Sequence, residues 1–216
     1  MSERLADQAY KNIERMILTA ELQPGAWFAE TAIAERIGLG RTPVREAVQR
    51  LAFHRLVEVV PGRGLRVTDV NVRDQLLIVE LRREIELLLV RRAARLRAPG
   101  EARALRELSD AMRALRSMED ATDFYRLDLE FKMQLLAAAR HPYASDAVAP
   151  LWSASRRFAW VYKTAQDTAL VADQLCRTMN AIAEGDEPTA AATTIERMDY
   201  LARFAHATLN LSVPPS

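Results

Sequence analysis

The feature that most constrains the fold is a change of pattern near residue 70. Five of the seven glycines lie between residues 25 and 64, so turn-forming residues are concentrated in the first third of the chain. From residue 72 to residue 211 the apolar residues recur with a helical period, and few glycines interrupt them. We therefore expect a mainly α-helical protein with a mixed domain over residues 1–70 and an all-helical domain over residues 71–216.

The mixed domain carries the signals of a helix-turn-helix. A helix is expected over residues 30–37, and the "GLG" of residues 38–40 then breaks it. A second helix should follow, with Thr42 as its cap and Pro43 at its first position, and should reach about His54. A strand, the "PGRG" turn and a returning strand come next, which predicts a β-hairpin wing beside the helices.

The second of these helices has two faces of different chemistry. Its buried stripe is expected at Val44, Ala47, Val48 and Leu51, because these positions follow the i, i+3, i+4, i+7 spacing. The opposite, solvent-facing side then carries Arg41, Thr42, Arg45 and Gln49. Arginine can bond to guanine, glutamine to adenine, and threonine to a base edge, so this face can read base pairs in a major groove. An ordinary amphipathic helix with solvated arginines is the alternative.

The charge of one segment, and not that of the whole chain, supports the prediction of DNA binding. The whole chain has a formal net charge of only +1, but residues 41–66 hold six arginines against two acids. A positive patch on a nearly neutral protein is typical of a site for a polyanion. The sequence has no apolar run that could span a membrane, and its single cysteine cannot form an internal disulfide, so a cytoplasmic location is expected.

The N-terminal motifs resemble the winged helix of GntR-family transcription regulators. The resemblance is carried by the "PG" of residues 24–25, "RTPVREA" at 41–47, "RL" at 50–51 and "PGRG" at 61–64. It implies contacts to DNA from the start of the second helix and from the wing. The residues expected to touch DNA are Arg41, Thr42, Arg45, Gln49, Arg50, Gly62 and Arg63.

Charged residues also interrupt the apolar stripes of the helical domain, where burying a charge requires a partner. Arg82 lies on the line of Ile78, Ile85 and Leu89, and it either pairs with Glu86 inside the bundle or waits in a cavity for a carboxylate ligand.

Two further segments pose the same choice between a structural and a binding role. Asp128 lies at the edge of another stripe, with Lys132 four residues on, as a surface pair or as part of a site. An aromatic stripe ends at Tyr162, with Arg156 beside it, and is either core or pocket lining.

The helical domain resembles the FCD branch of the GntR family, whose bundle of six or seven helices surrounds an effector cavity. "VELRREIE" at 79–86 and "RLDLEFK" at 126–132 carry the resemblance. Many members bind a divalent metal there through one aspartate and three histidines. Here Asp128 is present, but Lys132 stands at the next ligand position, and the later two fall at Leu175 and at or near Met198. We therefore expect no metal or other cofactor, with Lys132 in its place.

The sequence predicts a ligand-responsive transcription regulator, expected to act as a repressor. A homodimer should read an inverted repeat in double-stranded DNA, because two winged helices match its two-fold symmetry. A small organic acid is the expected effector, with Arg82, Asp128, Lys132, Arg156 and Tyr162 as the residues expected to bind it. Two alternatives are an enzyme acting on such an acid, for which no nucleophile–base pair is evident, and a winged helix that contacts only protein.

Overall fold

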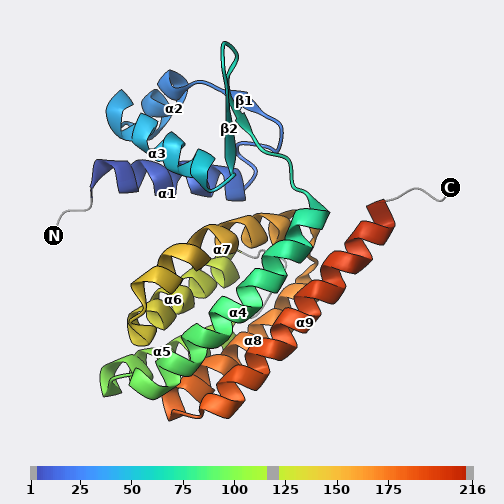
Figure 1. Ribbon diagram of the computed structural model, residues 1–216. Helices are drawn as coiled ribbons and strands as arrows, with labels where there is room; N and C mark the ends of the chain where they lie inside the picture. Colours follow the sequence, from blue (N-terminus) through green and yellow to red (C-terminus); the bar gives the residue numbers. More distant parts are fainter. Residues whose placement is uncertain (1–3, 116–121, 213–216) are drawn as a thin grey trace. The chain divides into compact units, whose positions relative to one another are not determined.

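The protein is mainly α-helical with one small antiparallel sheet (Figure 1). The computed structural model describes residues 4–115 and 122–212, with side chains as far as residue 209. Within these ranges no helix has the length and apolar character needed to cross a membrane. The chain forms two compact units: residues up to Asn71 together with 150–161 make the first, and residues 72–149 together with those from Tyr162 onward make the second.

The first unit contains the helix-turn-helix and the wing. In chain order its main elements are α1 (Leu5–Leu18), β1 (Trp27–Phe28), α2 (Glu30–Ile37), α3 (Arg41–Phe53), β2 (Val57–Val60) and β3 (Gly64–Val67). Helices α1 and α2 pack on α3, and a single apolar core joins all three to the sheet. Ile13 and Ile17 of α1 meet Val48 and Leu51 of α3 in this core, each at most 2% exposed.

The sheet has the strand order β1-β3-β2, so the hairpin β2–β3 is extended by the short strand β1. The hairpin register pairs Val57 with Val67 and Val60 with Gly64. Gly62 lies in the turn with a φ of +74°, a left-handed conformation that glycine adopts without strain. The turn therefore carries the Arg63 side chain into solvent at the tip of the wing.

The start of α3 differs from the prediction. The helix begins at Arg41, and Gly40 rather than Thr42 is its N-cap residue, without a side-chain cap. Pro43 is therefore the third helical residue and not the first. It is still accommodated, because the backbone N–H groups of the first turn have no acceptor within the helix. The consequence is that the Thr42 hydroxyl is not used as a cap and lies on the exposed side.

The second unit is a helical bundle. Six helices cover the described residues after Asn71, namely α4 (Val72–Leu96), α5 (Pro99–Arg113), α6 (Thr122–Ala139), α7 (Pro142–Tyr162), α8 (Ala165–Glu184) and α9 (Glu187–Ser212). The C-terminal half of α7, residues 150–161, is grouped with the first unit. Helix α4 packs against α9, α6 and α8, and α5 packs against α8 and α6. Helix α4 therefore contacts three of the other helices in the bundle.

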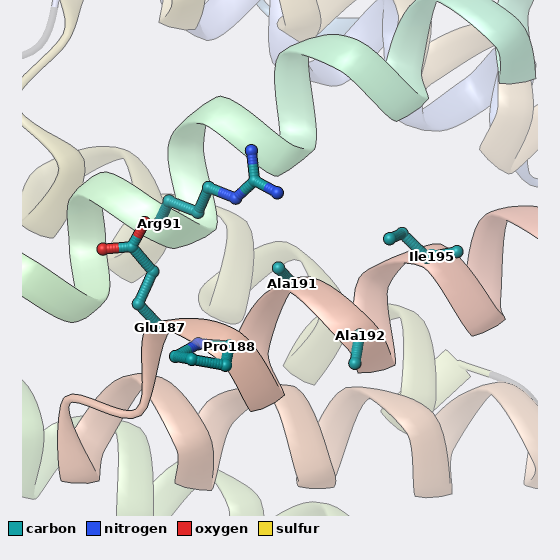
Figure 2. A pocket seen from close by; sticks show the side chains of 6 residues that line it. All are labelled: Arg91, Glu187, Pro188, Ala191, Ala192 and Ile195. Atoms are coloured by element: carbon teal, nitrogen blue, oxygen red, sulfur yellow. The ribbon is translucent and has the colours of Figure 1, made fainter.

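A groove of about 540 Å³ lies on the surface between α4 and α9 (Figure 2). Arg91 of α4 forms one side, and the other is formed by residues near the start of α9, namely Glu187, Pro188, Ala191, Ala192 and Ile195. Two of these residues are alanines, so the groove floor has little side-chain bulk. It differs in chemistry from the polar interior of the bundle described below.

Candidate functional site

The exposed face of α3 has the composition that its spacing predicts. Val44, Ala47, Val48 and Leu51 are buried, whereas the four polar residues of the outward face are all exposed, namely Arg41, Thr42, Arg45 and Gln49. Only Arg45 among these four has an ion pair in the described residues, with Nε 3.3 Å from Glu30 Oε2. Such an exposed pair contributes at most about 1 kcal/mol, so it does not prevent Arg45 from turning to a nucleic acid.

Arg50 is placed differently from the rest of this group. Its Nη1 atom lies 2.6 Å from Asp7 Oδ1, and its guanidinium lies 4.6 Å from the centre of the Tyr10 ring. Both partners belong to α1, so Arg50 connects α1 to α3 within the unit. Its proposed contact with DNA therefore competes with these interactions and stays a prediction.

Tyr10 makes a second connection to the end of α3. Its hydroxyl lies 2.8 Å from Nδ1 of His54 and also donates to Glu14 Oε1 over 3.2 Å. Burial lowers the pKa of His54 below its ordinary value, and the charge of Arg50 lowers it further. Both effects favour the neutral form of His54, and its ring connects the end of α3 to Tyr10 of α1.

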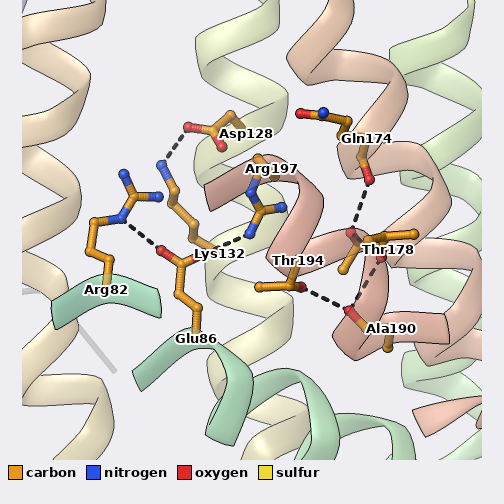
Figure 3. Close-up of polar contacts among 10 residues, drawn as sticks. Arg82, Glu86, Asp128, Lys132, Gln174, Thr178, Ala190, Thr194 and Arg197 are labelled. Carbon is orange, nitrogen blue, oxygen red and sulfur yellow. Dashed lines mark hydrogen bonds and ion pairs between the residues drawn. The ribbon is translucent and has the colours of Figure 1, made fainter. Parts of the chain in front are cut away.

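The interior of the bundle contains a polar cluster formed by α4, α6 and α9 (Figure 3). Glu86 is at its centre: Oε1 lies 2.7 Å from Arg82 Nε, and Oε2 lies 2.6 Å from Arg197 Nη2. Asp128 and Lys132 form a second pair, with Oδ2 and Nζ 2.5 Å apart. The side chains of Arg82, Glu86 and Arg197 are each at most 7% exposed.

The charges of this cluster do not balance. Arg82, Lys132 and Arg197 supply three positive charges, and Glu86 and Asp128 supply two negative ones. Burial lowers the pKa of Arg197 from its ordinary value; the charge of Glu86 opposes this effect and that of Arg82 adds to it. A further anion in this space would reduce the cost of holding these cations away from water.

One hydrogen-bond donor of the cluster has no acceptor among the described residues. Arg197 Nη1 is buried and unpaired, although Nη2 of the same guanidinium bonds to Glu86. Arginine presents its N–H groups as a planar fork that fits a carboxylate in two parallel bonds. The open half of this fork is therefore suited to one oxygen of an anionic ligand.

Lys163 adds a fourth cation near the cluster. It follows α7 and is partly exposed, with Nζ 5.6 Å from the centre of the Tyr200 ring of α9. Burial lowers its pKa to about 7; Arg82 and Lys132 act in the same direction, and Asp128 and Asp167 oppose them. Lys163 therefore changes charge near neutral pH, in a position where its charge is felt by the cluster.

The structure brings together only some of the predicted effector residues. Arg82, Asp128 and Lys132 lie in the cluster. Tyr162 is half-buried at the end of α7. Arg156 belongs to the part of α7 grouped with the first unit, and its Nε atom is buried without a hydrogen-bond partner. The roles of Arg156 and Tyr162 stay predictions.

Sequence reasoning missed Arg197 and Lys163, and it assigned Glu86 no role beyond a possible pair. The signal for Arg197 was present, because Ala190, Thr194, Arg197 and Leu201 share the spacing of one buried helix face. A charged residue on such a face needs a partner elsewhere in the bundle. Lys163 had no comparable signal, since it lies between two helices.

Comparison with known proteins identifies the two units. The profile of the family "Bacterial regulatory proteins, gntR family" matches residues 5–67, and that of the FCD domain matches residues 77–200. The chain belongs to the GntR family. Its fold class, a winged helix-turn-helix followed by a helical domain, is that of solved GntR regulators. The relatives of this GntR-family chain are transcription regulators that bind DNA, and they are not enzymes.

Individual relatives agree with this assignment. The HTH-type transcriptional regulator McbR of Escherichia coli is 26% identical over 67% of this chain and 66% of its own length. An HTH-type regulator from Agrobacterium vitis is 33% identical over 61% of this chain and 78% of its own length. The Escherichia coli repressor RspR is 28% identical over 65% of this chain. The matched region spans less than two thirds of the length of McbR and 62% of that of RspR.

Solved structures share the fold. The structure of E. coli McbR/YncC superimposes with a TM-score of 0.82 at 20% identity, covering 97% of this chain and all of that one. A GntR transcriptional regulator from Rhodococcus sp. RHA1 gives a TM-score of 0.72 at 22% identity, covering 94% of this chain and 98% of its own.

The metal site that the FCD resemblance implies does not fit the residues of this GntR-family chain. Asp128 is bonded to Lys132, and Leu175 and Met198 are apolar residues at most 3% exposed. Within the described residues, no group of three or more His, Cys, Asp or Glu side chains could hold a metal ion. One carboxylate with no imidazole is a poor donor set for zinc or another transition metal.

Proposed function

We propose that this chain is a cytoplasmic homodimeric repressor whose hold on DNA is controlled by a small organic acid bound in the FCD bundle. The outward face of α3 reads an inverted-repeat operator in double-stranded DNA through Arg41, Thr42, Arg45 and Gln49. The wing, with Gly62 and Arg63 at its turn, lies against the neighbouring backbone or minor groove. This follows from the exposure of these side chains and from the docking geometry of helix-turn-helix proteins.

The observation that carries the effector proposal is the buried excess of positive charge. Arg82, Lys132 and Arg197 face the same space, and Arg197 Nη1 lacks an acceptor among the described residues. A carboxylate placed there accepts from Arg197 and from the guanidinium of Arg82, whose Nε is already occupied by Glu86. Asp128 repels a second negative charge on its own side of the cluster, so ligands with one carboxylate near Arg197 are favoured.

Lys132 supplies the positive charge that a metal ion supplies in many members of the family. Its ammonium lies 2.5 Å from Asp128 and supplies a positive charge without a bound ion. Effector binding in this chain is therefore independent of zinc, nickel or other divalent metals. Arg156 and Tyr162 are proposed as further contacts of the effector.

Control of DNA binding requires the effector to prefer one arrangement of the dimer over another. Arg82 and Glu86 both lie on α4, and α4 begins directly after the residues that follow the wing. An anion that draws Arg82 and Arg197 together shifts α4 relative to α9. Helix α4 is therefore the proposed connection between the effector site and the DNA-binding domain.

The test combines ligand binding with operator binding. Thermal-shift screening of the full chain against small carboxylates identifies ligands, because a ligand of the folded state raises its melting temperature. Operator DNA is selected from a random library. Fluorescence anisotropy with this DNA then measures how the carboxylate changes operator affinity, which is the effector response. We expect Arg82→Ala to lose the response while keeping DNA affinity, and Arg126→Ala, an exposed arginine on α6, to keep both. A normal response in Arg82→Ala would refute the assignment of the site.

A further inference from the structure

Helix α4 carries an apolar stripe on its exposed face. Leu77, Leu81 and Leu88 are 66%, 52% and 41% exposed, whereas the opposite side of the helix packs on α9 and α6. Together with Glu84 they follow a spacing of four and three residues, which keeps side chains on one line of a helix and is the spacing of helix-pairing seams. Large apolar residues aligned in this way are typical of a surface that another chain covers.

The charged residues of the same face are segregated along the helix. The N-terminal half carries the acids Asp74 and Glu80 beside Arg73, Glu84 lies at the midpoint, and the C-terminal half carries Arg91 and Arg95. Arg95 is exposed, and its Nε lies 3.4 Å from Glu187 Oε2 of the same chain. A second copy of α4 lying parallel would bring like charges together along the whole face. An antiparallel copy brings the acidic half of each helix against the basic half of the other, which favours that orientation.

The groove between α4 and α9 lies next to the basic end of this face (Figure 2). Arg91 belongs to both features. Because Ala191 and Ala192 form part of the opposite wall, the groove has room for a side chain from outside the bundle. In an antiparallel pair, the N-terminal end of the second α4 arrives beside Arg91, so Leu77 of that copy is placed to enter the groove.

We propose that two copies of this chain pair through the exposed face of α4, antiparallel and about a two-fold axis. Leu81 of each copy lies beside Leu88 of the other, Asp74 of each lies beside Arg95 of the other, and Leu77 of each occupies the groove of the other. This inference rests on the homodimer of the proposed function and assigns its surface. Such an interface is self-complementary, as a closed two-fold dimer requires.

The same arrangement places the two Glu84 side chains near the axis. Like charges facing each other weaken a helix pair, and an apolar residue there would continue the leucine stripe. Glu84→Leu is therefore expected to tighten the dimer. This is a distinctive consequence, because substitution of an exposed glutamate elsewhere on the bundle, such as Glu130→Leu on α6, should leave the dimer unchanged.

Sedimentation equilibrium of the full chain tests the surface. Leu81→Glu places a carboxylate twice in the interface and should raise the dimer dissociation constant by about 100-fold or more. Leu170→Glu is the matched control, because Leu170 is 43% exposed on α8. Circular dichroism checks that both variants are folded. A wild-type dimer that persists in Leu81→Glu would overturn the assigned surface but leave the proposed regulator intact, whereas a wild-type monomer would contradict both.

Disulfide crosslinking tests the orientation. The double variant Leu81→Cys, Leu88→Cys should form a covalent dimer under oxidation, because these positions adjoin across the axis. The two copies of Leu77 lie about 22 Å apart along an antiparallel pair, too far for a disulfide, so Leu77→Cys should stay monomeric on a non-reducing gel. In a parallel pair each position lies beside its own copy, so crosslinking of Leu77→Cys would show a parallel pair and overturn the proposal, whether or not the double variant also crosslinks. The native Cys176 is buried and does not interfere.

Discussion

Removing the charge of Glu86 perturbs the polar cluster at its centre. Glu86 accepts from Arg82 and Arg197 at 2.7 and 2.6 Å, and all three side chains are at most 7% exposed. Glu86→Gln keeps the shape of the side chain and one carbonyl acceptor but leaves two buried guanidiniums without their counter-charge. Breaking a buried ion pair in this way costs about 3–5 kcal/mol of unfolding free energy, and the retained acceptor places the expected loss near the lower figure.

Urea and thermal unfolding of the full chain measure this loss. For a chain of this length, about 3 kcal/mol corresponds to a decrease of roughly 6–12 °C in melting temperature. Glu130→Gln is the control, since Glu130 is an exposed glutamate on α6. A small carboxylate should restore more stability in Glu86→Gln than in the wild type, because the anion replaces the lost charge. Equal stability of Glu86→Gln and Glu130→Gln would refute the reasoning.

Three further predictions concern DNA binding, pH and the connection between α1 and α3. Arg45→Ala should weaken operator binding by about 1–3 kcal/mol and relax base preference in anisotropy titrations against single-base operator variants. Unchanged affinity and unchanged base preference would show that Arg45 does not contact the bases. The affinity for a carboxylate should be highest below pH 7 and should fall as the pH rises through about 7, because Lys163 then loses its proton and a bound anion holds that proton more tightly. Calorimetry should show this fall in the wild type and not in Lys163→Met. An identical pH profile in both proteins would exclude Lys163 as the titrating group. Arg50→Ala loses its contacts with Asp7 and Tyr10, so the winged helix should be destabilised by roughly 1 kcal/mol in urea unfolding, and full stability would show that these contacts are not significant.

Much of the winged helix could be predicted because its signals are local. Gly38 ends α2 in a left-handed conformation with φ +66°, as the break at residues 38–40 predicts, and α2 has the predicted bounds of residues 30–37. The spacing of Val44, Ala47 and Val48 predicts which face of α3 is buried. The wrong start of α3 arose because Thr42 and Pro43 suit a cap and a first position individually, whereas the backbone turns at Gly40.

The effector cluster could be predicted only in part because its geometry is not local. Pairs four residues apart on one helix, such as Arg82 with Glu86 and Asp128 with Lys132, can be found from spacing. The bond from Arg197 to Glu86 joins residues that are 111 positions apart, and it depends on how α4 and α9 pack. The excess of positive charge is visible only once these helices are assembled.

The central claim is that fixed side-chain cations, and no metal, hold the effector of this regulator. The most direct measurement is operator binding by protein that has been dialysed against a strong chelator, titrated with a carboxylate found by thermal-shift screening, with metal content determined on the same sample. The account predicts that operator affinity responds to the carboxylate to the same extent before and after chelation, with less than one metal ion per ten chains. A response that disappears on chelation and returns with one equivalent of zinc or nickel would contradict it.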